Sequence, residues 1–157
     1  PSTQSAQSRY NGRGAEDLAG KGTQRVGLLD LFGRRSKRFW SEEAYRSAVA
    51  RQVAMVPATL EKLVGFGVSD EDLMKLEYFF YTDTVSKASA LACELAELGY
   101  EVERRLSSTR EEQSLVTGWT RPLRMGDDAV TAWVRKMCAL GRKYDCEFDG
   151  WGTSPGR

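Results

Sequence analysis

Histidine is absent from all 157 residues of the chain. Its absence removes the commonest general base in enzymes, the usual partner of a serine or cysteine nucleophile, and the commonest metal ligand. Enzymes that manage without histidine use paired carboxylates or lysines, and no stretch of this sequence forms a recognisable active site of that kind. We therefore expect a protein that is not an enzyme and that uses no cofactor, metal ion or small-molecule substrate.

Long apolar runs and paired cysteines are also missing. No run approaches the roughly 20 apolar residues that span a bilayer, and residues 1–14 lack the apolar segment of a signal peptide. The three cysteines, Cys93, Cys138 and Cys146, are odd in number and form no CxxC pair, so reduced thiols are expected rather than a disulfide framework or a zinc site. These features predict a soluble cytoplasmic protein that does not bind membranes.

Positive charge is concentrated at the start of the chain. Residues 1–38 carry eight basic and three acidic residues, a net charge of +5, whereas the whole chain has a net charge of +1. Residues 1–36 are rich in Gly, Ser, Gln and Arg and have few large apolar side chains, which is typical of segments that bury too little surface to fold. We expect residues 1–38 to form a basic, disordered leader.

The end of this leader suggests a hypothesis of RNA binding. A basic run with aromatic neighbours can contact RNA phosphates and stack on bases. The residues of this hypothesis are Arg34, Arg35, Lys37, Arg38 and Trp40. A solvated cluster of charges without a specific ligand is the alternative interpretation.

Residues 39–72 are expected to form a helical extension. Ser41, followed by two glutamates, predicts the N-cap and acidic first turn of a helix that runs to about residue 53. Pro57 suits the first turn of a second, short helix over residues 58–64, which one of the following glycines would end.

Residues 73–153 are expected to form the folded body, with a short tail at 154–157. Hydrophobic patterning predicts two successive β-α-β units, with strands over residues 75–82, 100–106, 115–123 and 144–153 and helices that start near residues 84 and 126. Two split βαβ units predict an α+β, ferredoxin-like sandwich, in which a four-stranded antiparallel sheet carries two helices on one face. Right-handed crossovers would place the first and third strands at the centre and the last strand at an edge.

The last strand, YDCEFDGWGT, carries an acidic row and a tryptophan between two glycines. Alternation would turn Cys146 and Phe148 to one side and Asp145, Glu147 and Asp149 to the other, and the glycines predict a turn that sets the ring of Trp151. Carboxylates about 7 Å apart along a strand would need further ligands to hold a metal ion, so an acidic ridge that docks Arg or Lys of a partner protein is the better functional interpretation. Solvated charges that deter strand pairing are the alternative.

The sheet face away from the helices should carry aromatic side chains. Either face of the first strand has them, and in RNA-binding modules such aromatics stack on bases. The acidic residues of the same sheet would repel phosphates, which favours a protein partner. Trp119 and Trp151 are the candidate anchors of such an interface. Two alternatives stay open: the tryptophans pack the sheet edge, or the helix over residues 41–53 covers this face.

Several blocks of residues 73–153 resemble the regulator of ribonuclease E activity B family, RraB. The blocks are KLEYFFYTDT, ELAELGYEVE, VTGWT and WVRKMCALGRKYDCEFDGWGT. The resemblance implies a ferredoxin-like domain and a non-catalytic protein inhibitor that binds ribonuclease E and modulates RNA decay. An RNA-binding module or a protein-interaction domain with another partner is the alternative.

Overall fold

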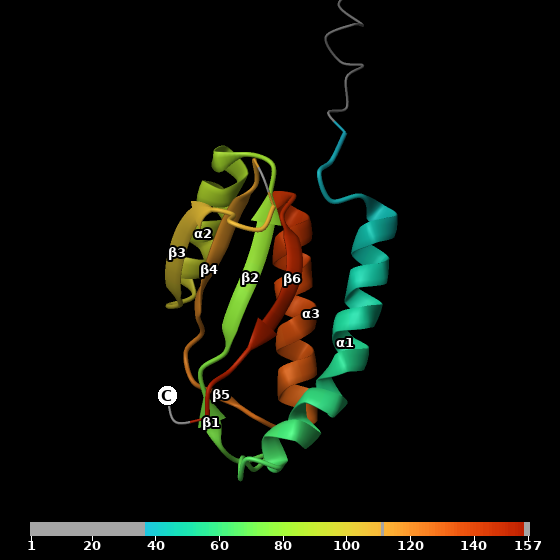
Figure 1. The fold of residues 1–157 in the computed structure, drawn as a ribbon, viewed down its shortest axis with the longest axis vertical. Coiled ribbons are helices and arrows are strands. Elements are labelled where there is room, and N and C mark those ends of the chain that lie inside the picture. Colours follow the sequence, from blue (N-terminus) through green and yellow to red (C-terminus); the bar gives the residue numbers. More distant parts are fainter. Residues whose placement is uncertain (1–36, 111, 156–157) are drawn as a thin grey trace, which may run out of the picture. The chain divides into compact units, whose positions relative to one another are not determined.

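The computed structural model describes residues 37–110 and 112–155, so Arg34 and Arg35 lie outside the described residues. The described part contains three helices and six strands (Figure 1). In chain order they are α1 (Glu42–Val64), β1 (Leu73–Met74), β2 (Glu77–Thr82), α2 (Val85–Glu97), β3 (Glu101–Leu106), β4 (Ser114–Trp119), β5 (Leu123–Arg124), α3 (Asp127–Tyr144) and β6 (Glu147–Gly152).

Four strands form an antiparallel sheet in the order β3-β4-β2-β6, and the short strands β1 and β5 form a separate antiparallel pair. The first and third strands of the four, β2 and β4, thus lie at the centre, and the last strand, β6, lies at an edge. Helices α2 and α3 lie on the same side of the sheet, behind it in the view of Figure 1. The fold is therefore α+β, with helices on one sheet face.

The face toward α2 and α3 holds the largest part of the core. Tyr78, Phe80 and Phe148 are fully buried there, and the ring of Phe148 packs edge-on against that of Trp133 of α3, with centroids 6.1 Å apart. Close approach of α3 depends on Gly141, since a Cβ at this position would lie 2.4 Å from the Cys146 carbonyl oxygen. The residues of β2 alternate between full burial on this side and partial burial on the other.

Helix α1 is continuous, so the expectation of two helices divided near Pro57 is wrong. Ser41 caps the helix by accepting a hydrogen bond of 3.2 Å from the Ala44 amide, and Pro57 lies within it. A proline inside a helix removes one backbone hydrogen bond. The helix continues because Val56 and Leu63, on either side of the proline, are both buried in the core, and α1 packs along α3.

The predicted last strand is partly helix. Helix α3 runs to Tyr144 and ends at Asp145, whose left-handed conformation (φ 57°) turns the chain into β6. The Cys146 amide then donates to the Gly141 carbonyl at 2.8 Å, which is the 6→1 hydrogen bond of a Schellman motif. Asp145 therefore does not belong to the acidic row of the strand, contrary to the expectation from alternation.

The glycine-flanked tryptophan is a strand segment and not a turn, which corrects a second expectation. Strand β6 pairs with β2 through Gly150, Trp151 and Gly152. Its register shifts between Phe79 and Phe80, which pair with Gly150 and Phe148, so Asp149 is the extra residue of a β-bulge. The bulge re-aims the residues around Asp149 toward α1.

Candidate protein-binding groove

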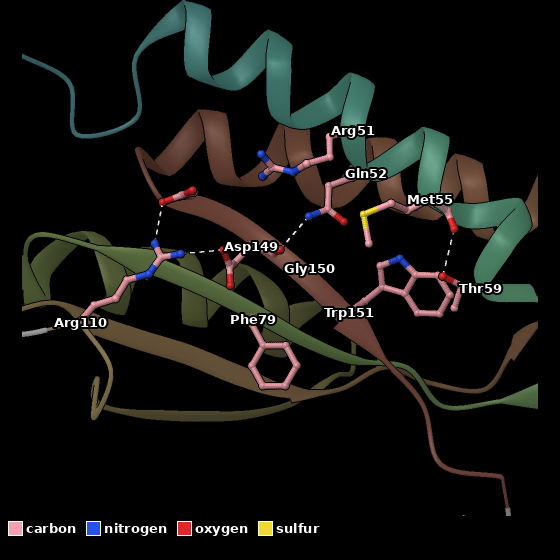
Figure 2. Close-up of a pocket in the computed structure, with 10 residues that line it drawn as sticks. Arg51, Gln52, Met55, Thr59, Phe79, Arg110, Asp149, Gly150 and Trp151 are labelled. Atoms are coloured by element: carbon pink, nitrogen blue, oxygen red, sulfur yellow. Dashed lines mark hydrogen bonds and ion pairs between the residues drawn. The ribbon is translucent and has the colours of Figure 1, made fainter. Parts of the chain in front are cut away.

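A groove of about 600 Å³ separates α1 from the edge strand β6 (Figure 2). Its principal side chains are Gln52 and Met55 of α1, Glu147, Asp149 and Trp151 of β6, and Arg110 of the β3–β4 loop. Three of these, Glu147, Asp149 and Trp151, are candidate binding residues from the sequence, and the structure brings them together. Trp119 lies elsewhere, at the end of β4 on the open face of the sheet.

The α1 wall of the groove is fixed by a buried amide. Gln52 is 3% exposed and donates a hydrogen bond of 2.7 Å from its side chain to the Asp149 carbonyl at the bulge. Met55, one turn further on, is 51% exposed and lines the groove. Thr59 donates to the Met55 carbonyl at 3.0 Å, across the turn that contains Pro57. The groove thus joins a rigid polar contact to an exposed apolar side chain.

Arg110 pairs with both carboxylates of the acidic row of β6. Its guanidinium lies 2.7 Å from Glu147 and 2.6 Å from Asp149, and it stacks over the Tyr81 ring at 4.0 Å from the centroid. Both carboxylates are only partly exposed, at 27% and 40% of their side-chain area. The ridge expected from the sequence is therefore paired internally, and because one guanidinium serves two carboxylates, a partner that approaches it meets a surface whose negative charge is reduced but not removed.

The third carboxylate of the expected ridge, Asp145, joins three separate segments of the chain. It accepts hydrogen bonds of 2.9 Å from the backbone amides of Phe39 and Trp40, and it lies 2.8 Å from the Lys87 ammonium of α2. Burial acts to raise the pKa of Asp145, but the hydrogen bonds from Lys87, Trp40 and Phe39 outweigh it and lower the pKa to about 2. Asp145 is an anchor of the fold rather than a docking residue.

Trp151 contributes to both the core and the groove. Its ring meets that of Trp133 of α3 edge-on, with centroids 6.1 Å apart, and it lies among the groove residues in Figure 2. Trp151 therefore packs partly against the core, as one of the alternatives expected. The rest of its surface is exposed at the groove.

The open face of the sheet is not covered by α1. The helix packs along α3 and contacts β6, so the idea that residues 41–53 cover this face is wrong for the part of the chain that the structure describes. Phe79 and Tyr81 of β2 and Trp119 of β4 lie on this face, partly buried, with Glu77 and Glu101 paired to either side of Trp119. Aromatic and acidic side chains thus share the open face.

The described part of the basic run is mostly engaged by the fold. Trp40 is 2% exposed, so its ring cannot stack on a base. The RNA hypothesis is therefore wrong for this residue. Arg38 pairs with Asp145 at 3.6 Å and donates to the Arg142 carbonyl, whereas Lys37 is exposed.

Three of the six principal groove side chains, Gln52, Met55 and Arg110, escaped the sequence analysis. Gln52 lies four residues from the buried Ala48 and Val56, so helical spacing could have marked it as inward-facing. Arg110 lies in a polar connection without periodicity, and no local signal indicated that it crosses to β6.

Residues 37–110 and 112–155 give little support for a metal site, a membrane-spanning helix or a nucleophilic buried cysteine. These residues hold no group of three or more Cys, Asp or Glu side chains placed to bind a metal ion. None of the helices in this part of the chain has the length and apolarity to cross a bilayer. Cys138 and Cys146 are buried and unpaired thiols, and burial raises the pKa of each to about 11, so neither is a ready nucleophile.

A groove of paired charges, a buried amide and half-buried aromatic rings, on an α+β sheet, has the composition of a small protein-binding domain. The family model described as "Regulator of ribonuclease activity B" matches residues 57–153, and the chain belongs to this family. Strands β1 to β6, helices α2 and α3 and the last third of α1 lie in the matched region, as do most of the groove residues. This is a family of regulators of ribonuclease activity and not a family of enzymes.

Curated bacterial relatives with this name are similar over the same region. The protein of Escherichia coli (strain K12) is 28% identical over 96 residues, which are 60% of this chain and 70% of the relative. The protein of Salmonella typhi is 29% identical over 96 residues, with the same coverage. That of Photobacterium profundum is 25% identical over 118 residues, 70% of this chain and 85% of the relative.

Proposed function

We propose that this protein binds an endoribonuclease of the ribonuclease E type and lowers its activity, with the α1–β6 groove as the contact surface. The single observation that carries the proposal is the family match over residues 57–153, which contain most of the groove side chains. A regulator of this kind would act in the cytoplasm, through protein contacts, with no catalytic step of its own.

The groove has the composition of an interface core. Met55 and Trp151 supply apolar surface on opposite walls, and such side chains are enriched where protein interfaces are fully buried. Because Arg110 pairs with Glu147 and Asp149, a partner that binds here does not have to desolvate two unpaired carboxylates. The paired charges therefore support docking with a small desolvation cost.

The strand order supports a more specific fold class, and this class explains how the groove is formed. We infer a ferredoxin-like split βαβ sandwich from the strand order β3-β4-β2-β6 with α2 and α3 on one face. In this arrangement α1 is an addition that lies against α3 and creates the groove. The helical extension would then belong to the binding surface, while a role of the leader in RNA contact would rest on Lys37 and the residues before it.

A matched pair of variants on α1 tests the surface. Met55→Glu places a carboxylate in the groove at a position that is already half exposed. Ala54→Glu introduces the same charge one residue away, at an exposed position outside the groove. The measurement is cleavage of an RNA substrate by the purified ribonuclease E-type enzyme of the same organism, with and without each protein, together with direct binding.

The wild-type protein and Ala54→Glu should bind the enzyme and slow cleavage, and Met55→Glu should bind at least tenfold more weakly. Equal behaviour of the two variants would move the contact away from the groove. A wild-type protein that neither binds the enzyme nor is recovered with it from nuclease-treated lysate would contradict the proposed partner.

A further inference from the structure

The open face of the sheet carries a second pocket, of about 310 Å³, which is separate from the groove. The side chains that matter in it are Glu77, Glu101, Glu103, Arg105, Thr117 and Trp119. They come from three neighbouring strands, in three successive cross-strand rows, the third of which contributes Arg105. Glu101, Trp119 and Glu77 form one row, and Glu103 and Thr117 belong to the next.

Thr117 lines this pocket, and its buried hydroxyl has no hydrogen-bond partner among the described residues. Thr117 is 3% exposed, and among the described residues nothing accepts from or donates to its Oγ1 atom. An unsatisfied buried hydroxyl costs roughly 1–3 kcal/mol, and native proteins keep few of them. Threonine is therefore a poor choice for this position if folding alone is considered, since valine has the same shape and no polar atom.

The charges around Thr117 define what can enter the pocket. Glu77, Glu101 and Glu103 line it with negative charge, and the indole of Trp119 forms part of its wall. Carboxylates beside an aromatic ring recognise cations, and a guanidinium combines ion pairing, stacking and several N–H donors. Phosphate groups of RNA would meet repulsion from the same carboxylates.

Cations of the chain itself already form exposed ion pairs with two of these carboxylates. Arg105 lies 3.6 Å from Glu103, and both side chains are more than half exposed. Lys75 lies 2.5 Å from Glu101, with side chains 42% and 61% exposed. Exposed pairs of this kind contribute little to stability, so an incoming cation can replace Arg105 at a small cost.

We propose that this pocket binds an arginine side chain from a basic segment of a protein partner. The guanidinium pairs with Glu103 and Glu101, stacks on Trp119 and donates a hydrogen bond to the Thr117 hydroxyl. The inference goes beyond the groove and the ribonuclease, because it assigns a separate surface and a chemical preference that holds for any partner with such a segment.

A fluorescently labelled peptide of alternating glycine and arginine tests the pocket by fluorescence anisotropy. The comparison peptide contains citrulline, which keeps the shape of arginine and lacks its charge. We expect the arginine peptide to bind the full chain at least tenfold more tightly than the citrulline peptide. Thr117→Val should weaken binding of the arginine peptide five- to tenfold, and its unfolding midpoint should be equal to that of the wild type or higher. Thr117→Ser, which keeps the hydroxyl, should bind as the wild type does.

Two double variants separate the pocket from general charge attraction. Glu101→Gln with Glu103→Gln removes two carboxylates of the pocket, and Glu43→Gln with Glu61→Gln removes two exposed carboxylates of α1. The first pair should lower the affinity at least tenfold and the second less than twofold. Equal losses, or a Thr117→Val protein that binds as the wild type does, would overturn the proposal. Tighter binding of a single-stranded RNA than of the peptide, lost in Thr117→Val, would overturn it in favour of nucleic acid.

Discussion

The carboxylate of Asp145 accepts a hydrogen bond of 2.9 Å from the backbone amide of Trp40, 105 positions earlier in the chain. The same carboxylate accepts from Phe39 and pairs with Lys87, so one side chain holds the segment before α1, the start of α2 and the end of α3. The buried Trp40 ring is thereby fixed against Gly141, whose position leaves room for it. The beginning of the described chain is thus built into the same core as the sheet.

Asp145→Asn should destabilise the fold at neutral pH and remove a pH dependence. The pKa of Asp145 falls from 3.8 to about 2 on folding, so its ionised form contributes about 2 kcal/mol at neutral pH, with 13% of the side chain exposed. Because the folded pKa is the lower one, this stability is complete above pH 4 and is lost as the pH falls toward 2. Asparagine accepts the left-handed conformation equally well, so the backbone is not strained.

Urea unfolding of wild type and Asp145→Asn at several pH values measures this effect. The two stability curves should converge between pH 4 and pH 2. A constant difference across that range would show that the loss comes from packing and not from the charge.

Arg110 and Glu147 should be energetically coupled. Removing either side chain breaks an ion pair that is about 70% buried at both ends and, for Arg110, a contact with the Tyr81 ring. We expect Arg110→Ala to cost about 1–2 kcal/mol, and a double-mutant cycle with Glu147→Ala to give a coupling of about 1 kcal/mol. The coupling should fall in 1 M salt. Strict additivity in denaturant unfolding would mean that the pair contributes nothing.

Gly141→Ala should destabilise the protein, although the same change normally stabilises a helix. A Cβ would lie 2.4 Å from the Cys146 carbonyl oxygen and 2.9 Å from the Trp40 ring, and backbone on one side cannot yield cheaply. We expect a loss of roughly 2–4 kcal/mol. Gly152→Ala is the control, because a Cβ on this glycine would meet nothing within 4 Å, and it should change the unfolding midpoint little. Similar stability of both variants would refute the close approach of α3.

Pro57→Ala should stabilise the protein. Alanine can donate the backbone hydrogen bond to the Val53 carbonyl that proline cannot, and it has the higher helix propensity. Part of the gain is offset because alanine leaves the unfolded chain more freedom, so we expect about 1–2 kcal/mol and a higher melting temperature. A lower melting temperature would indicate that the proline favours a bend on which the packing of α1 depends.

The order of the elements was predictable because it rests on local signals. The strand over residues 75–82 and the helix starts near residues 84 and 126 are each visible within about a dozen residues of sequence, and all three are confirmed by β2, α2 and α3. The two errors in helix boundaries arose where tertiary contacts overrode the local pattern. Packing kept α1 helical through Pro57, and a left-handed cap at Asp145 ended α3 where alternation predicted a strand.

The candidate site was predictable only in part, because its key contacts are long-range. Glu147, Asp149 and Trp151 stood out as an acidic strand with a tryptophan, but their charge is partly offset by Arg110, which lies 37 residues before Glu147. The Gln52 contact with Asp149 spans 97 residues. Sequence spacing shows which residues share a face. The net charge of that face also depends on ion pairs with residues far away in the sequence, which spacing does not show.

The two edges of the four-stranded sheet differ in how a further strand could reach them. At β6, helix α1 lies alongside and Gln52 occupies the Asp149 carbonyl, while at β3 every residue but Val102 is exposed. Within the part of the chain that the structure describes, a further strand is therefore hindered at β6 more than at β3, where the backbone edge has no helix beside it.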